Sequence, residues 1–266
     1  MHALWVTTPA GSVIELVLRR WVAQLDSRPL VERVEREASV LRALRQHGYA
    51  LGPELIAAHA SGIETGGTPA LLMTRLPGRL VLSPKEPTLW LRQMARELAR
   101  IHALQIDAPP YEPWFGPADL GPKPWAKEQA AWAEAARIVG AGLPSQPAAF
   151  LHRDYQHFNL LWTGQRLTGV VDWAEASAGP PSVDVAHCRW NLAVLFSVGM
   201  AEAFRLMYEA ESGNATDPRF DLATLVGYGP GSKLGIVGQV AGRRPIDING
   251  MDARVDELLL AVLRRC

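Results

Sequence analysis

Residues 151–159 read LHRDYQHFN, and the apolar run LTGVVD follows at 167–172. Together they place a carboxylate, a carboxamide and a second carboxylate at fixed offsets, in Asp154, Asn159 and Asp172. Transfer of a phosphoryl group requires a positioned hydroxyl, a base that accepts its proton, and metal ions that absorb the charge of the phosphates. These three side chains are of the types that such a site needs, so the pattern predicts phosphoryl-transfer chemistry.

A short hairpin is predicted to bring the second carboxylate back beside the carboxamide. The apolar residues after the loop form a first strand, Gly164 lies in a polar turn, and Leu167 to Val171 form a second strand. Mg²⁺ prefers oxygen ligands and usually takes one or two protein carboxylates together with phosphate oxygens. The sequence therefore predicts that Asn159 and Asp172 bind Mg²⁺, which leaves Asp154 to accept the proton.

This segment resembles the catalytic and metal loops of the aminoglycoside phosphotransferase and choline kinase-like phosphotransferase family, whose members are distant relatives of protein kinases. The motif covers roughly twenty contiguous residues. The resemblance implies that Asp154 orients or deprotonates the substrate hydroxyl and that Asn159 and Asp172 hold magnesium. It also implies that His152 is structural and that Asp184, within SVDVAH, braces the catalytic loop.

The alternative is that these residues occupy ordinary surface turns, because Asp, Asn and His side chains form local hydrogen bonds there. For any one of them this is the better explanation. For the whole set, including the apolar strand that ends at Asp172, chance agreement is on the order of one in a thousand. The motif as a unit therefore supports the prediction.

The composition is that of an ordinary globular enzyme. The chain has 266 residues, of which 48% are hydrophobic, enough for one large domain or two lobes. Its 27 basic and 27 acidic residues balance, which gives no electrostatic reason to expect a nucleic acid or a membrane as partner. Two cysteines predict no disulfide framework, and no leader or long apolar span is recognisable. We expect small-molecule partners and a cytoplasmic location.

The N-terminal part of the chain predicts a hairpin followed by a helix. Strands are expected near 2–8 and 13–20, on either side of the turn signal PAGS, and the second strand ends in Arg19 and Arg20. The helix is expected from Leu30 to Gln46, because its apolar residues recur every three or four positions.

Glu37 lies beside the apolar stripe of this predicted helix, and a carboxylate there needs a partner to offset its desolvation. Arg19 is the predicted partner. The resemblance implies that the pair belongs to the nucleotide site, where the strand residue contacts the phosphates and the helix glutamate holds it. Arginine replaces the more usual lysine, and its guanidinium binds phosphate bidentately. The alternative is an exposed arginine beside a solvated glutamate.

The resemblance implies an α+β, protein kinase-like two-lobe fold, with a small antiparallel sheet in the N-terminal lobe and a mainly helical C-terminal lobe. Residues 1–76 would form the nucleotide-binding lobe and residues 77–266 the helical lobe with the catalytic and metal loops. In related kinases the segment between the lobes offers backbone groups to the adenine ring. Thr74, Arg75 and Leu76 would have this role.

Helices are expected beyond residue 77, at Pro87–Leu104, Trp125–Val139, Val185–Glu211 and Asp252–Arg265. The segment 105–125 is rich in proline, glycine and aromatic residues and resists regular structure. We expect it to be a packed loop, with a role in the substrate pocket as the alternative.

One departure from the family concerns the N-terminus. In these kinases a first strand and a glycine-containing phosphate loop precede the segment that resembles HALWV, whereas this sequence starts at Met1. The expectation is that both are missing, either because the recorded start lies too far downstream or because the protein has lost part of its nucleotide clamp. Such a loss would weaken nucleotide binding and slow turnover.

The leading hypothesis is a kinase that moves the γ-phosphate of ATP or GTP to a hydroxyl of a small molecule, with Mg²⁺ as cofactor. The alternative is a nucleotide-binding pseudokinase or scaffold with little catalysis. A protein kinase is disfavoured because AEASAGPPSV, between Asp172 and Asp184, is not a recognisable activation segment. A metal hydrolase that uses His152 and Asp154 fits the apolar strand less well. Four acidic residues late in the chain would suit a cationic acceptor, but the helix dipole explains them equally well. They are Asp247, Asp252, Asp256 and Glu257.

Overall fold

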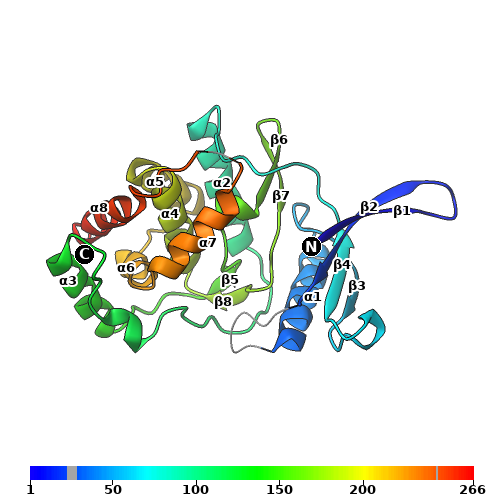
Figure 1. Ribbon diagram of the computed structural model, residues 1–266, viewed down its shortest axis with the longest axis horizontal. Coiled ribbons are helices and arrows are strands. Elements are labelled where there is room, and N and C mark those ends of the chain that lie inside the picture. Colours follow the sequence, from blue (N-terminus) through cyan, green and yellow to red (C-terminus); the bar gives the residue numbers. More distant parts are fainter. Residues whose placement is uncertain (23–28, 244) are drawn as a thin grey trace. The chain divides into compact units, whose positions relative to one another are not determined.

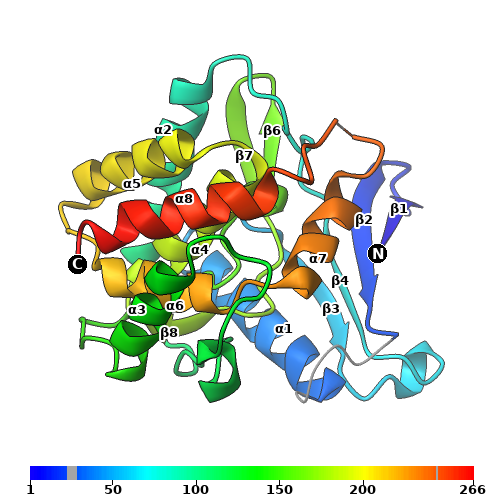
Figure 2. The same cartoon turned by 60° about the vertical axis from the view of Figure 1, so that its left-hand side comes forward.

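The computed structural model describes residues 1–22, 29–243 and 245–266. The chain divides into two compact units, each built from two segments that lie apart in the sequence (Figures 1 and 2). The segments are Met1–Leu80 with Asn159–Ala176 in the first unit, and Val81–Phe158 with Ser177–Cys266 in the second. Within the described ranges, every helix is too short or too polar to cross a lipid bilayer.

The first unit contains a four-stranded antiparallel sheet with the strand order β1-β2-β4-β3. Its strands are β1 (His2–Thr7), β2 (Val13–Arg20), β3 (Leu55–His59) and β4 (Ala70–Thr74). The predicted N-terminal hairpin is confirmed, with His2 opposite Leu18 and Thr7 opposite Val13. The sequence pattern did not predict β3, because LIAAH is short and rich in alanine, which has low strand propensity.

Helix α1 (Leu30–Gln46) has the predicted bounds and packs against β3 and β4 (Figure 1). Its buried face includes the expected apolar stripe of Val34, Ala38, Leu41 and Leu44. Beyond the helix, Gly48 has a φ of +68°. Glycine adopts this left-handed conformation without the steric penalty of a Cβ, so the chain can turn away from the helix there. A 3-10 turn, η1 (Ile63–Thr65), joins β3 to β4.

The predicted hairpin after the catalytic loop is also present, as β6 (Leu160–Thr163) and β7 (Arg166–Val170). It belongs to the first unit. Arg79 forms a β-bridge with Trp162, and the Val170 amide donates a 2.8 Å hydrogen bond to the Leu51 carbonyl. These backbone contacts join the hairpin to the N-terminal segment.

The second unit is mainly helical. It comprises α2 (Pro87–His102), α3 (Gln129–Gly140), α4 (Ser182–Leu195), α5 (Val198–Ser212), α6 (Pro218–Val226), α7 (Pro230–Val240) and α8 (Met251–Leu263), with the two-stranded sheet of β5 (Ala149–Leu151) and β8 (Ser177–Gly179) and the 3-10 turn η2 (Pro117–Leu120). Another 3-10 turn, η3 (His157–Asn159), crosses the boundary between the units.

Helix α4 is the core of the second unit and packs against α5, α6 and α8 (Figure 2). Every residue of α4 except Trp190 is buried. A helix that is buried on all sides has no polar face to present to water. Its Cys188 is a buried free thiol, and burial raises the pKa of this thiol well above its ordinary value. The thiol is therefore a small core side chain.

The single helix predicted over Val185–Glu211 is wrong, because the chain breaks it into α4 and α5. Ser197 lies at the break with extended dihedral angles, and its hydroxyl accepts a 3.2 Å hydrogen bond from the Met200 amide. A serine in this N-cap position satisfies an amide that has no partner within its own helix. The local capping preference therefore outweighs the continuous apolar pattern.

Three further differences come from residues that start helices. The predicted helix at Trp125 begins only at Gln129, whose side-chain amide donates to the carbonyls of Lys123 and Ala126 and holds the preceding loop. The pattern did not predict α6 or α7. Both begin with a proline at the first helical position, and Asp217 caps α6 by accepting a hydrogen bond from the Arg219 amide.

Gly78 marks a close approach between the N-terminal segment and the β6–β7 hairpin. Its φ is +108°, and a Cβ there would lie 2.6 Å from the Thr168 Oγ1 and 2.9 Å from the Trp162 backbone. We expect Gly78→Ala to lower the free energy of unfolding by about 2–4 kcal/mol, because strain and backbone overlap act together. Urea denaturation measures the change.

Gly164→Ala, in the turn of the β6–β7 hairpin, is the matched control. Gly164 has a φ of +60°, and a Cβ at this position would have open space for 4 Å around it. The alanine variant should lose only the left-handed penalty, about 1–2 kcal/mol. Equal losses in the two variants would contradict the close approach at Gly78.

Candidate active site

Arg19 joins two carboxylates in the first unit. Its Nη1 atom donates to Glu37 Oε1 at 3.0 Å and Oε2 at 3.1 Å, and to Asp172 Oδ1 at 2.6 Å. The Glu37 side chain is 1% exposed, so the alternative of a solvated glutamate is wrong and the predicted ion pair is present. The guanidinium also lies 4.7 Å from the ring centre of Trp21. These contacts fix the cation at the end of β2.

The protonation of this cluster is set by burial and charge together. Burial raises the pKa of Glu37 to about 7, and the opposing attraction of Arg19 only partly offsets it. Burial lowers the pKa of Arg19, but Glu37 and Asp172 outweigh that effect and raise it. Arg19 is therefore a permanent cation, whereas Glu37 changes charge near neutral pH.

The β6–β7 hairpin brings Asn159 and Asp172 together, as predicted. The Val171 amide donates a 2.9 Å hydrogen bond to the Asn159 carbonyl, and Asp172 is the next residue. Asp172 has a φ of +68°, a left-handed conformation that is uncommon for residues other than glycine. Asn159 is 8% exposed, and the Asp172 side chain is 29% exposed.

The donor atoms of this pair suit Mg²⁺. One carboxylate and one carboxamide are hard oxygen donors, and Mg²⁺ needs few protein ligands when phosphates supply the others. In the described ranges, no group of three or more His, Cys, Asp and Glu side chains is arranged to hold a metal ion. The donor set therefore favours Mg²⁺ with a phosphate ligand over a site built wholly from protein side chains.

Asp184 holds the backbone of the catalytic loop in the second unit. Its Oδ2 accepts from the His152 amide and its Oδ1 accepts from the Arg153 amide, each at 2.8 Å, and His102 Nε2 lies 3.1 Å from Oδ2. Arg153 has a φ of +72°. Burial raises the pKa of Asp184, but the hydrogen bonds and charges of His102 and His152 outweigh it and hold the pKa below its ordinary value. The carboxylate therefore stays ionised inside the protein.

Asp154 follows this pinned segment directly. Its Oδ1 accepts from Gln156 Nε2 at 2.6 Å and from His187 Nε2 at 2.9 Å, and Asn191 donates to the His187 carbonyl at 3.0 Å. An ionised Asp154 carboxylate can only accept in this bond, which then requires the proton on Nε2 of His187. The Asp154 side chain is 26% exposed. It is thus oriented and accessible.

His187 is a site residue that we did not predict. It lies in the SVDVAH segment, three residues after Asp184, so the two side chains share one face of α4. That spacing was the available signal. The spacing alone does not identify His187 as a site residue, because Asp154 comes into contact with His187 only in the folded protein.

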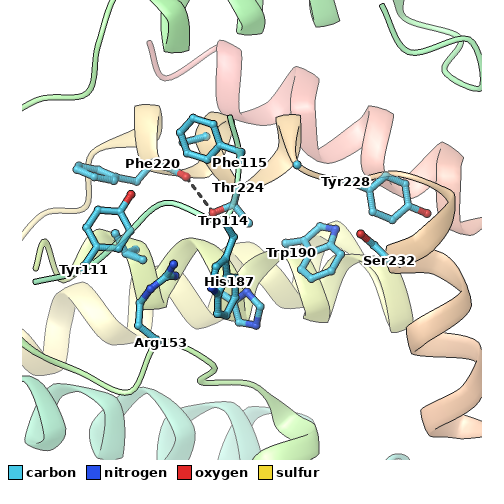
Figure 3. Close-up of a pocket in the computed structure, with 13 residues that line it drawn as sticks. Tyr111, Trp114, Phe115, Arg153, His187, Trp190, Phe220, Thr224, Tyr228 and Ser232 are labelled. Carbon is cyan, nitrogen blue, oxygen red and sulfur yellow. Dashed lines mark hydrogen bonds between the residues drawn. The ribbon is translucent and has the colours of Figure 1, made fainter. Parts of the chain in front are cut away.

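A cavity of about 230 Å³ lies beside His187 in the second unit (Figure 3). The edge of the Trp114 ring meets His187 with ring centres 5.2 Å apart. We expected the segment 105–125 to be a packed loop, but three of its aromatic side chains line the cavity: Tyr111, Trp114 and Phe115. The segment thus contributes to a cavity wall, and its role in a substrate pocket stays a prediction.

The segment expected to contact adenine continues from β4. The Thr74 amide donates to the Glu54 carbonyl at 2.9 Å, and the Arg75 amide donates to the Glu15 carbonyl at 3.0 Å. Both amides are therefore used within the first unit. A Cβ on Gly169 would lie 2.8 Å from the Leu76 Cδ1. The contact with adenine stays a prediction for these residues.

Residues 3–223 match the sequence model of the phosphotransferase enzyme family, APH. The chain belongs to this family. The resemblance seen in the catalytic and metal loops is thereby confirmed, together with the α+β, protein kinase-like fold. A comparison with curated proteins found no match.

Solved structures of family members share the fold of this chain. A proposed aminoglycoside phosphotransferase from Ralstonia eutropha JMP134 is 17% identical, with a TM-score of 0.62 over 98% of this chain and 89% of that chain. The choline kinase LicA from Streptococcus pneumoniae is 15% identical, with a TM-score of 0.58 over 99% and 90%. A thermostable variant of the phosphotransferase APH(4)-Ia, in complex with ADP and hygromycin B, is 17% identical, with a TM-score of 0.57 over 99% and 93%.

The pKa of Glu37 leads to a pH-dependent stability. The folded protein binds the proton of the Glu37 carboxyl group more tightly than the unfolded chain does. The pKa of this group is about 7 in the folded protein, against an ordinary value of 4.5. The free energy of unfolding should therefore fall as pH rises across this interval, by up to about 1.4 kcal/mol per pH unit. In Glu37→Gln this contribution to the slope should disappear. Urea denaturation between pH 5 and 8, on the order of one unit apart, measures it.

Glu54→Gln is the control, because Glu54 is half-exposed and pairs with Arg45 on the surface. This variant should keep the slope of the unmodified protein, since exposed pairs contribute little. An unchanged slope in Glu37→Gln would show that Glu37 titrates alike in the folded and unfolded states.

Proposed function

We propose that this phosphotransferase-family protein transfers the γ-phosphoryl group of ATP or GTP to a hydroxyl group of a small molecule. The observation that carries the proposal is the contact of Arg19 with both Glu37 and Asp172. In the proposal, this cation binds phosphate, and the Asp172 carboxylate within hydrogen-bond distance of it offers the hard oxygen atoms that Mg²⁺ prefers. Membership of the phosphotransferase family supports kinase chemistry on small molecules.

In the proposed reaction, Asn159 and Asp172 hold Mg²⁺, and Arg19, positioned by Glu37, binds the phosphates. The bound metal supplies positive charge that stabilises the transferring phosphoryl group. Asp154 accepts the proton of the acceptor hydroxyl while the new O–P bond forms and the bond to the leaving nucleoside diphosphate breaks. His187 and Gln156 orient the Asp154 carboxylate, and Asp184 holds the loop.

An adenine nucleotide is the better supported co-substrate. One structurally similar protein was solved with ADP, and the amicoumacin kinase hAmiN, which is 16% identical, was solved with AMP-PNP, Ca²⁺ and Ami. We propose that residues 74–76 receive the adenine ring through backbone groups. Comparing the affinity for ATP with the affinity for GTP tests this preference.

Asp154→Ala tests the proposed base. Turnover should fall by about 10²–10⁴-fold, because the acceptor loses its proton acceptor, whereas the affinity for Mg²⁺-ATP should change by less than about twofold. ADP release with the best acceptor of a hydroxyl-compound screen measures turnover, and calorimetry measures affinity. Asp107→Ala, at an exposed aspartate, is the control and should resemble the unmodified protein. Near-normal turnover of Asp154→Ala would remove Asp154 from the mechanism.

Asp172→Ala tests the proposed metal ligand. Calorimetric titrations with ATP and with GTP, each with and without Mg²⁺, should show metal-dependent binding in the micromolar to millimolar range for the unmodified protein. The variant should lose the gain in affinity that Mg²⁺ gives, because one of two protein ligands is absent. If its metal dependence is unaltered, Asp172 is not a ligand. If the unmodified protein binds neither nucleotide, the proposed function itself fails.

A further inference from the structure

The cavity beside His187 is walled mainly by aromatic rings (Figure 3). The six aromatic residues of its wall come from the segment 105–125 and from α4, α6 and the turn after α6: Tyr111, Trp114, Phe115, Trp190, Phe220 and Tyr228. Among the described residues that line it, Arg153 carries the only permanent charge, and none is a carboxylate. Aromatic walls with few polar groups suit a compact, largely apolar ligand.

Arg153 already covers two of the six aromatic rings of the wall, Trp114 and Tyr111. Its guanidinium lies 4.0 Å from the ring centre of Trp114 and 4.8 Å from that of Tyr111, and its Nη2 donates to the Glu112 carbonyl at 2.6 Å. Arg153 is only 5% exposed, so this charge is fixed and poorly screened. A second cation in the cavity would be repelled instead of held by cation–π contacts.

Two acidic residues late in the chain, Asp252 and Asp247, are engaged by the protein itself. Asp252 accepts from the Tyr228 hydroxyl at 2.9 Å and pairs with Lys233 at 2.7 Å. Asp247 pairs with Arg254 at 2.9 Å. These belong to the late acidic residues that would have suited a cationic acceptor. Their partners neutralise them, so they do not make the cavity attractive to a polycation.

Trp190, one of the residues that line the cavity, carries a buried hydrogen-bond donor. Its Nε1 atom is buried and has no hydrogen-bond partner among residues 1–22, 29–243 and 245–266. Trp190 is also the one residue of α4 that is not buried, and its ring centre lies 5.7 Å from that of His187 and 5.9 Å from that of Tyr228. A buried donor without a partner is unfavourable, and an acceptor atom on a ligand would satisfy it.

We propose that the phosphate acceptor is a compact aromatic alcohol or phenol, neutral or anionic, with a hydrogen-bond acceptor for Trp190, and not a polycation. This inference rests on the proposed function. The cavity volume of about 230 Å³ exceeds the roughly 150 Å³ that holds one benzene ring, so it suits one substituted ring. His187 connects this wall to Asp154, which it contacts through Nε2. The acceptor hydroxyl would thus lie at the His187 side of the cavity.

Three probes of similar size separate charge from shape: tyrosol is neutral, 4-hydroxyphenylacetate is anionic, and tyramine is cationic at neutral pH. Calorimetry and ligand-observed NMR without nucleotide measure their binding. Tyrosol and 4-hydroxyphenylacetate should bind, and tyramine should bind at least about tenfold more weakly because of Arg153. Hygromycin B, a large polycation, should not bind. Equal or tighter binding of tyramine or hygromycin B would overturn the inference.

Two variants test the residues, Trp190 and Arg153, on which the inference about the acceptor depends. Trp190→Phe keeps a ring but removes the donor, so the affinity for tyrosol should fall about three- to tenfold. Arg153→Asn removes the charge with a residue that tolerates a positive φ, and tyramine should then bind within about threefold of tyrosol. Trp5→Phe, at a tryptophan that is 62% exposed in β1, should leave all affinities unchanged. Circular dichroism confirms that each variant is folded.

Binding and transfer distinguish this inference from the proposed function. Probe binding in the expected order without transfer from Mg²⁺-ATP would support the cavity assignment and contradict the kinase. Mg²⁺-ATP binding with transfer to a cationic acceptor would support the kinase and contradict the cavity assignment. A folded protein that binds none of the three aromatic probes would overturn the cavity assignment, whatever its nucleotide affinity.

Discussion

A buried carboxylate, Asp184, is the constraint on which the second unit's part of the site depends. It accepts two amides of the catalytic loop from a helix that is itself buried almost completely. Charge-assisted hydrogen bonds of this kind are short and directional, so the loop has little freedom. One turn later, the same helix presents His187 to Asp154. A single rigid element therefore sets both the backbone and the side-chain orientation of the proposed base.

The part of the site in the first unit depends on a cluster of charged side chains that is largely removed from water. One cation, Arg19, is shared by the two carboxylates of Glu37 and Asp172. Removal of one member of a buried ion pair commonly costs about 3–5 kcal/mol, because the remaining charge is left uncompensated. The raised pKa of Glu37 shows that desolvation already opposes the charged form. The cluster is therefore maintained at an energetic cost, which is typical of functional sites.

Local patterns predicted much of this molecule. The loop with Asp154, the hairpin that ends at Asp172, and the Arg19–Glu37 pair all follow from spacing, strand alternation and the need to neutralise a buried charge. The roles proposed for these residues remain predictions. His187 and the aromatic cavity could not be predicted in this way, because distant segments supply their parts. The break at Ser197 and the short helices α6 and α7 were missed because caps and prolines override apolar periodicity.

The two-segment construction of the first unit has a consequence for biosynthesis. Arg19 and Asp172 are separated by 153 residues, and the segment that completes the unit ends at Ala176. At roughly 5–20 residues per second, a ribosome needs about 5–20 s to translate from residue 81 to residue 176. During this time the N-terminal sheet lacks the hairpin that covers Gly78 and Leu76. The nascent chain thus carries an incomplete surface, and contacts between such distant residues slow the final folding step.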